Sequence, residues 1–125
     1  MTRGYIYILL NAAMPGYLKI GKTERSPENR AKELSCVTGV PSPFVVAYEI
    51  LVRDCHEVER VLHEKLAKHR VSGQREFFSV PLKDAISLVS EIAVPYVAHG
   101  RKKQSIRETL AEVEELLRKL PERRD

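Results

Sequence analysis

The chain has 125 residues, of which 43% are hydrophobic and 30% charged, and its formal net charge is +4. This profile is typical of a globular protein with one domain and a short appendage, and its mild basicity permits binding to nucleic acid. We expect a cytoplasmic protein without a membrane partner, because no apolar run approaches the roughly 18 residues of a membrane span and no signal-peptide pattern or disulfide framework is present.

The first two predicted elements are strands at residues 5–10 and 17–21, which the loop 11–16 joins into an antiparallel hairpin. Alternation along the strands gives one apolar face with Ile6, Ile8, Leu10, Leu18 and Ile20. The opposite face carries Tyr5, Tyr7, Tyr17 and Lys19. We interpret this polar and aromatic face as the floor of a phosphate-handling site; an aromatic ladder on a solvated sheet face is the alternative.

Two helices and a third strand follow. Ser26 can cap a helix that runs to about Cys36, because Pro27 suits its first position and Glu28 favours the positive end of the helix dipole. Gly and Pro residues at 39–43 then lead into a strand at 44–52. Asp54 can cap a second helix at 55–70.

The rest of the chain predicts a short extended segment at 76–80, a helix from Pro81 to about Val94, and a polar linker at 98–104. Ser105 and Glu108 form a capping box before an amphipathic helix at 105–120. We therefore expect a domain at 1–97, the linker 98–104, and a C-terminal amphipathic helix and tail at 105–125. The last helix is too short for an isolated coiled coil, so it should pack on the domain or form a homodimer through residues 105–120.

The order of these elements predicts an α+β fold with a three-stranded antiparallel sheet flanked by helices. Within it, Tyr5-Ile6-Tyr7 is followed by Lys19-Ile20-Gly21-Lys22-Thr23, an arginine in the next helix and a glutamate in the helix after the third strand. This pattern resembles the GIY-YIG nuclease superfamily over about residues 4–80. It looks closest to a branch of phage and bacterial DNA-binding domains with KIG in place of YIG and a Glu-aromatic-Phe motif, here Glu76-Phe77-Phe78.

The resemblance implies metal-dependent hydrolysis of DNA. It assigns Tyr7 as general base or water-positioner, Arg30 as the phosphate contact, and Glu59 as the ligand of a single Mg²⁺ or Mn²⁺ ion. A hard cation of this kind takes oxygen ligands and keeps several waters, so one protein ligand is reasonable. The chain departs from the family pattern at Tyr5, which replaces the first glycine, and at Lys19, which replaces the second tyrosine.

Lys19 shares a hairpin face with Tyr7, and a nearby cation lowers the pKa of a phenol from its usual value of about 10. We therefore expect Lys19 to assist Tyr7 as a catalytic residue. The alternative is that Lys19 grips phosphate in a protein that no longer cuts DNA.

Further site residues are predicted around this set. Helical periodicity places Glu59, His63, His56 and Arg70 along one flank of the helix at 55–70, although an isolated Glu–His pair is more often a solvated polar pair. Candidate DNA contacts are Lys22, Arg25, His63 and Arg70. Candidate supporting residues are Tyr5, Tyr17, Gly21 and Glu76; for Glu76 a plain charge at a strand edge is the alternative.

Three functions fit these observations: a small metal-dependent DNA endonuclease, a catalytically silent DNA-binding module, and an interaction protein that acts through the helix at 105–120. The presence of Tyr7, Lys19, Arg30 and Glu59 together favours the first. The missing second tyrosine and the mild net charge favour the second.

Overall fold

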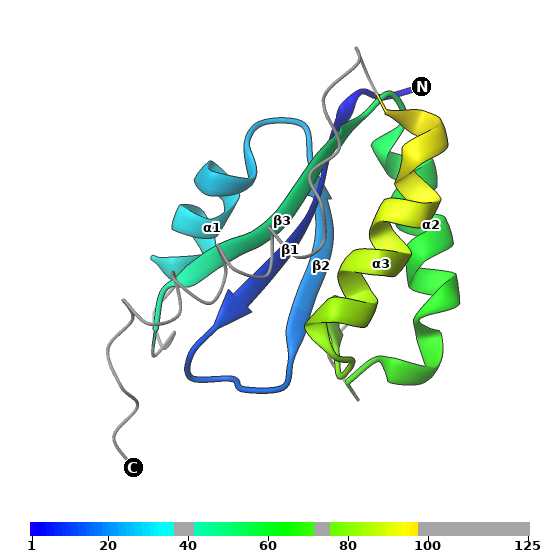
Figure 1. Cartoon of the computed structure of the whole chain (residues 1–125). Coiled ribbons are helices and arrows are strands. Elements are labelled where there is room, and N and C mark those ends of the chain that lie inside the picture. Colours follow the sequence, from blue (N-terminus) through cyan, green and yellow to red (C-terminus); the bar gives the residue numbers. More distant parts are fainter. Residues whose placement is uncertain (37–41, 72–75, 98–125) are drawn as a thin grey trace.

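The sheet of the protein is antiparallel, with four strands in the order β3-β1-β2-β4 (Figure 1). The computed structural model describes residues 1–36, 42–71 and 76–97. Strands β1 (Gly4–Asn11), β2 (Leu18–Thr23) and β3 (Phe44–Val52) lie where the sequence predicts them. The fourth strand, β4 (Phe77–Phe78), falls in the predicted extended segment and pairs with the edge of β2, so the sheet is one strand wider than expected.

Three α-helices are present in the described residues: α1 (Pro27–Ser35), α2 (Cys55–Lys65) and α3 (Leu82–Ala93), with short 3-10 turns at Ala67–His69 and Val94–Tyr96. The predicted caps are confirmed, since the Ser26 side chain accepts a hydrogen bond from Asn29 N and the Asp54 side chain accepts one from Glu57 N. The prediction that α2 reaches residue 70 is wrong. Ser79 N donates to His69 O and Val71 N donates to Phe77 O, so the chain leaves the helix in order to pair with β4.

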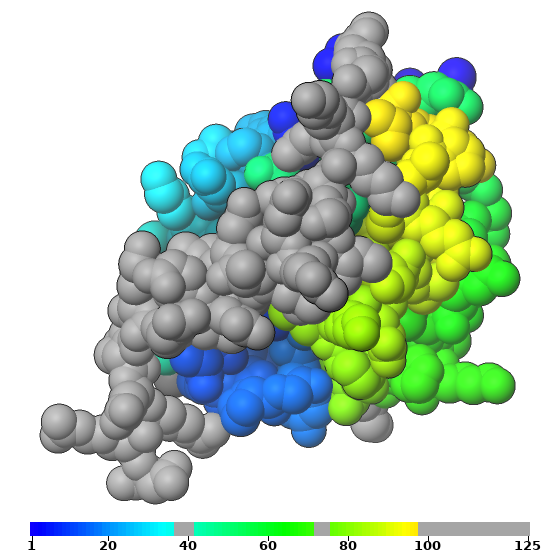
Figure 2. All heavy atoms as spheres, viewed as in Figure 1, coloured from blue at the N-terminus to red at the C-terminus, as the bar shows by residue number. Residues whose placement is uncertain are grey.

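The sheet lies between two layers of helices, with α1 on one side and α2 and α3 on the other (Figure 1). Figure 2, from the same side, shows the surfaces of α1 and α3 on opposite flanks of the molecule. The predicted apolar face of the hairpin packs on α2 and α3 and forms the main core, which includes Ile6, Ile8, Ile20, Val58, Leu62, Phe78, Ile86 and Val89. Burial of these side chains is the main favourable contribution to folding.

The α1 face of the sheet holds a second, smaller core of Tyr7, Leu9 and Ala31. Tyr7 is 1% exposed and Lys19 is 6% exposed, so the alternative of a solvated aromatic ladder is wrong for this part of the hairpin. Tyr7 and Lys19 are instead buried polar side chains, which need partners within the fold.

The predicted linker at 98–104 and the predicted amphipathic helix at 105–120 lie outside the described residues. Among the described residues, none of the helices is both long enough and apolar enough to cross a membrane.

Candidate active site

A cavity of 530 Å³ opens between α1, α2 and the edge of the sheet where β2 meets the segment before β4. We call it the central cavity. Its lining residues are Tyr7, Lys22, Thr23, Arg25, Arg30, Glu33, Glu59, His63, Arg70 and Glu76. Residues predicted from widely separated parts of the sequence thus meet in one place. Among the described lining residues, four side chains are cationic and three are carboxylates.

Three predicted site residues lie elsewhere. Tyr17 precedes β2, is 41% exposed and lines a separate apolar hollow of 710 Å³ at the hairpin turn, together with Leu10, Pro15 and Leu82. Tyr5 is half-buried and pairs with Thr23 at the far end of the hairpin. Lys19 does not line the central cavity but lies next to it, in contact with Glu76.

Gly21 makes room for the centre of the site. It pairs with Tyr7 across the β1–β2 ladder. A Cβ atom on Gly21 would lie 2.6 Å from the Tyr7 hydroxyl and 2.6 Å from Glu76 Oε1, closer than carbon and oxygen atoms approach in proteins. The missing side chain therefore allows the phenol and the carboxylate to occupy the same corner of the central cavity.

The Tyr7 phenol is held in its protonated form. Burial, with a smaller effect from the negative charge of Glu76, raises its pKa to about 12, although hydrogen bonding to Arg30 opposes this rise. The expectation that Lys19 lowers the pKa of Tyr7 is wrong. Lys19 pairs with Leu9 in the β1–β2 ladder, nearer the hairpin turn than the Tyr7–Gly21 pair. The cation that interacts with the phenol is Arg30.

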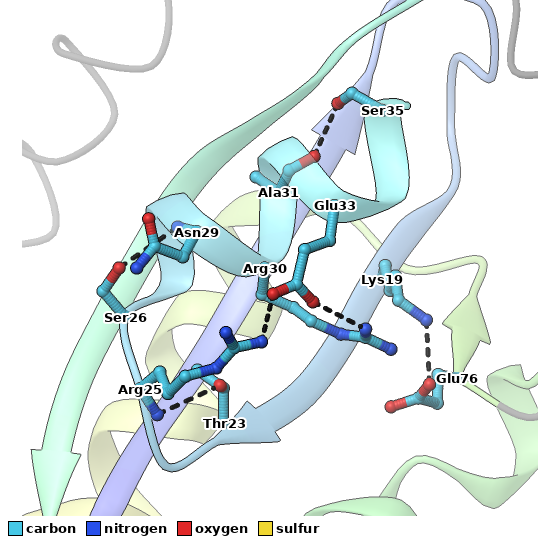
Figure 3. Close-up of polar contacts among 10 residues, drawn as sticks. All are labelled: Lys19, Thr23, Arg25, Ser26, Asn29, Arg30, Ala31, Glu33, Ser35 and Glu76. Carbon is cyan, nitrogen blue, oxygen red and sulfur yellow. Dashed lines mark hydrogen bonds and ion pairs between the residues drawn. The ribbon is translucent and has the colours of Figure 1, made fainter. Parts of the chain in front are cut away.

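The buried Lys19 side chain forms an ion pair with Glu76, whose side chain is partly exposed, and Lys19 Nζ lies 2.8 Å from Glu76 Oε2 (Figure 3). Lys19 Nζ also lies 5.2 Å from the centre of the Phe77 ring. Ile20 N also donates a 3.0 Å hydrogen bond to Glu76 O. Both the backbone and the side chain of Glu76 are therefore fixed to β2, so Glu76 is more than a charge at a strand edge.

Glu33 holds the two arginines of the central cavity. Arg25 and Arg30 lie side by side, and both contact the Glu33 carboxylate, Arg30 through Nη1 at 3.3 Å (Figure 3). Interaction with the Tyr7 hydroxyl raises the pKa of the Arg30 guanidinium. Glu33 was not among the residues predicted from the sequence. The available signal was its position three residues after Arg30 on the same helix, a spacing at which side chains meet.

The exposed flank of α2 supplies the rest of the site. Glu59 Oε1 lies 3.3 Å from Lys22 Nζ, and His63 Nε2 donates a 2.9 Å hydrogen bond to Ile20 O. The His63 ring meets the edge of the Phe78 ring, and the Arg70 guanidinium lies over that same ring. A second hollow of 510 Å³ continues from the central cavity along this flank, and its lining includes Lys22, His56, Glu59, His63 and Arg70. His56, Glu59 and His63 lie on α2 and line this hollow together, as helical periodicity predicted, whereas Arg70 lies beyond the end of α2 and reaches the hollow from the turn that follows.

Carboxylates are the oxygen donors that the central cavity offers to a cation. Within residues 1–36, 42–71 and 76–97, no group of three or more His, Cys, Asp or Glu side chains is arranged to hold a metal. Glu59 and Glu76 offer carboxylate oxygens to the same cavity.

Comparison with known protein families identifies a T5orf172 domain at residues 4–93. This range contains every residue that lines the central cavity. Comparison with curated proteins and with solved structures found no match. The family indicates a phage-related module that binds nucleic acid or resembles a nuclease. Since the matched range covers most of the sequence, the chain belongs to the T5orf172 domain family.

Proposed function

We propose that this protein is a GIY-YIG-type, metal-dependent endonuclease that hydrolyses phosphodiester bonds in DNA. The observation that carries the proposal is the convergence of Tyr7 from β1, Arg30 from α1 and Glu59 from α2 on the central cavity. A phosphoryl-transfer site needs groups that position water, balance the charge on the phosphate and bind a cation. These three residues supply one group of each kind.

The charges of the residues that line the central cavity support this proposal. A DNA phosphate in the central cavity would meet Lys22, Arg25, Arg30 and Arg70. Arg25 and Arg30 now share the carboxylate of Glu33, and a phosphate, with more acceptor oxygens, would compete with Glu33 for both guanidinium groups. The protonated Tyr7 hydroxyl can donate a hydrogen bond to a phosphate oxygen or orient the attacking water.

We propose that Glu59 binds a single Mg²⁺ or Mn²⁺ ion. The Glu59 side chain is 19% exposed and lines both the central cavity and the hollow on the α2 flank, so a hydrated ion can reach it. Lys22 would then exchange its contact with Glu59 for one with DNA. The ion would act as a Lewis acid on the phosphoryl group.

A catalytically silent DNA-binding module is the second candidate, and the ion pair between Lys22 and Glu59 favours it. In a silent module the same lysine would neutralise the carboxylate permanently, and the cavity would bind the DNA backbone without a metal. We also propose that residues 105–120 mediate self-association, which would present one site to each DNA strand.

Nicking of supercoiled plasmid at low salt separates the two candidates. The assay is run with Mg²⁺, with Mn²⁺ and with EDTA, alongside a mobility-shift assay on the same DNA. Nicking that requires metal supports the endonuclease. Salt-sensitive binding without nicking in any metal supports the silent module, because contacts with phosphates release counterions.

A further inference from the structure

We infer that Glu76, and not Tyr7, accepts the proton of the attacking water. This inference rests on the proposed endonuclease function and assigns its general base. The observation behind it is that the two oxygens of the Glu76 carboxylate have different surroundings.

Glu76 Oε2 is fixed, and Glu76 Oε1 faces the reaction site. Oε2 lies 2.8 Å from Lys19 Nζ, which is itself buried. Oε1 lies in the corner that Gly21 leaves open, beside the Tyr7 hydroxyl. The Glu76 side chain is 33% exposed and lines the central cavity, so water can reach this carboxylate. A carboxylate with one anchored oxygen and one oxygen facing the cavity has the geometry of a positioned general base.

Tyr7 is suited to donate a hydrogen bond rather than to accept a proton. Its phenol is buried and interacts with the Arg30 guanidinium. Burial and the charge of Glu76 raise its pKa to about 12, so the hydroxyl keeps its proton at neutral pH. A neutral phenol and a neighbouring carboxylate can therefore have different roles, in which the phenol donates a hydrogen bond and the carboxylate accepts a proton.

The other titratable proton acceptors among the described residues that line the central cavity have different contacts. His63 donates a hydrogen bond from Nε2 to Ile20 O, so its remaining acceptor is Nδ1, and its ring packs against Phe78. Glu59 contacts Lys22 and is the proposed metal ligand. Glu33 is bonded to both arginines.

The step balances as follows. The water oxygen forms a bond to phosphorus while one water proton moves to Glu76 Oε1. The bond between phosphorus and the ester oxygen breaks, and its electron pair leaves with that oxygen. The leaving oxygen then takes a proton from solvent. Lys19 is a positioning residue in this scheme, which explains why a lysine serves at this place on the hairpin.

The test is single-turnover DNA cleavage in saturating Mg²⁺ by the wild-type chain and by Glu76→Gln, Glu76→Ala and Tyr7→Phe. Binding of uncut DNA in EDTA is measured in parallel, since retained binding shows that a variant is folded. We expect Glu76→Gln to lower the cleavage rate about 10²–10⁴-fold, the usual contribution of a general base, with little change in binding. Tyr7→Phe should lose only about tenfold, as for one hydrogen bond. Added formate should restore part of the Glu76→Ala rate.

The matched control is Glu57→Gln, which makes the same charge change on α2 outside the central cavity and should cut like the wild type. For Lys19, the positioning role predicts that Lys19→Met lowers the rate and that Lys19→Arg restores most of it.

Several results would overturn the assignment. One is Glu76→Gln cutting at nearly the wild-type rate while Tyr7→Phe is inactive. Another is a loss of cleavage in Glu76→Gln that a higher Mn²⁺ concentration reverses, together with no rescue of Glu76→Ala by formate. That result would make Glu76 a metal ligand. A wild-type chain that cuts with no metal present or added overturns the metal proposal alone, whereas one that cuts under no condition ends both the endonuclease proposal and this one.

Discussion

Tyr7 and Gly21 face each other across the β1–β2 ladder, and the space beside the glycine holds the tyrosine hydroxyl. The same space holds Oε1 of Glu76. A glycine within a strand usually weakens it, because it has no side chain to pack. Here the missing side chain allows two polar groups to meet in the middle of the β1–β2 ladder.

Gly21→Ala should therefore slow cleavage strongly. The new methyl group would displace the Glu76 carboxylate, the proposed general base, together with the Tyr7 hydroxyl beside it, and we expect a loss of at least about 10²-fold, because catalysis depends on the positions of these groups. The control is Gly16→Ala, at the positive φ of 85° in the hairpin turn, where no neighbouring atom lies within 4 Å. It should cost about 1 kcal/mol of stability from backbone strain and leave cleavage intact. Equal cleavage by both variants would contradict this account of Gly21.

The phenol of Tyr7 should titrate at strongly alkaline pH. The tyrosinate absorbance of the folded protein should include a component that ionises near pH 12. That component should be missing in Tyr7→Phe. If the wild type and Tyr7→Phe differ only by a group that ionises near pH 10, Tyr7 is not buried as described.

The same raised pKa makes stability depend on pH. The folded state holds the phenolic proton more tightly than the unfolded state, so the contribution of Tyr7 is complete below pH 10 and is lost as the pH rises towards about 12. The two-unit difference corresponds to about 2–3 kcal/mol. Urea unfolding of wild type and Tyr7→Phe over this range should show a steeper alkaline loss in the wild type; parallel curves would refute the linkage.

Removing Glu33 should strengthen DNA binding. In Glu33→Gln, Arg25 and Arg30 lose the carboxylate that they share and become available to phosphates. We expect affinity at low salt to rise about 3- to 10-fold and the salt dependence to steepen by one to two phosphate contacts. Glu28→Gln is the control, because Glu28 is an exposed acid on the same helix. An equal gain in the control would show that only net charge matters.

The ion pair between Lys19 and Glu76 should stabilise the fold. Lys19→Met leaves the Glu76 carboxylate without its partner, and we expect a loss of about 1–3 kcal/mol in the free energy of unfolding. A double-mutant cycle with Glu76→Gln isolates the coupling, since the second change should cost less once the first is made. Purely additive losses would contradict a direct interaction.

Local signals in the sequence predicted much of the fold. Alternation placed Ile6, Ile8 and Ile20 in the main core, and the residues Ser26 and Asp54 marked where helices begin. The pairing of β4 with β2 and the early end of α2 were not predictable in this way. They depend on backbone hydrogen bonds between segments that meet only in the folded chain.

In the candidate site, too, local patterns predicted some residues, whereas contacts between distant segments could not be predicted. The family pattern predicted that Tyr7, Arg30 and Glu59 belong to one site, and helical spacing predicted that Glu59 lies beside His63. All four residues line the central cavity. The partner of Lys19 is 57 positions away, so no local pattern could show that this cation serves Glu76 and not Tyr7. Glu33 was overlooked because acid–base pairs at a spacing of three are common on exposed helices and usually contribute little.

The proposed function requires the central cavity to cut DNA with a metal ion bound to Glu59. Its most direct test is plasmid nicking in Mg²⁺ by wild type, Glu59→Gln and Glu57→Gln, with DNA binding measured on the same samples. Glu59 lines the central cavity and Glu57 does not, although both lie on α2. The account predicts that Glu59→Gln binds DNA and does not nick it, while Glu57→Gln nicks like the wild type. Nicking by Glu59→Gln at the wild-type rate would contradict it.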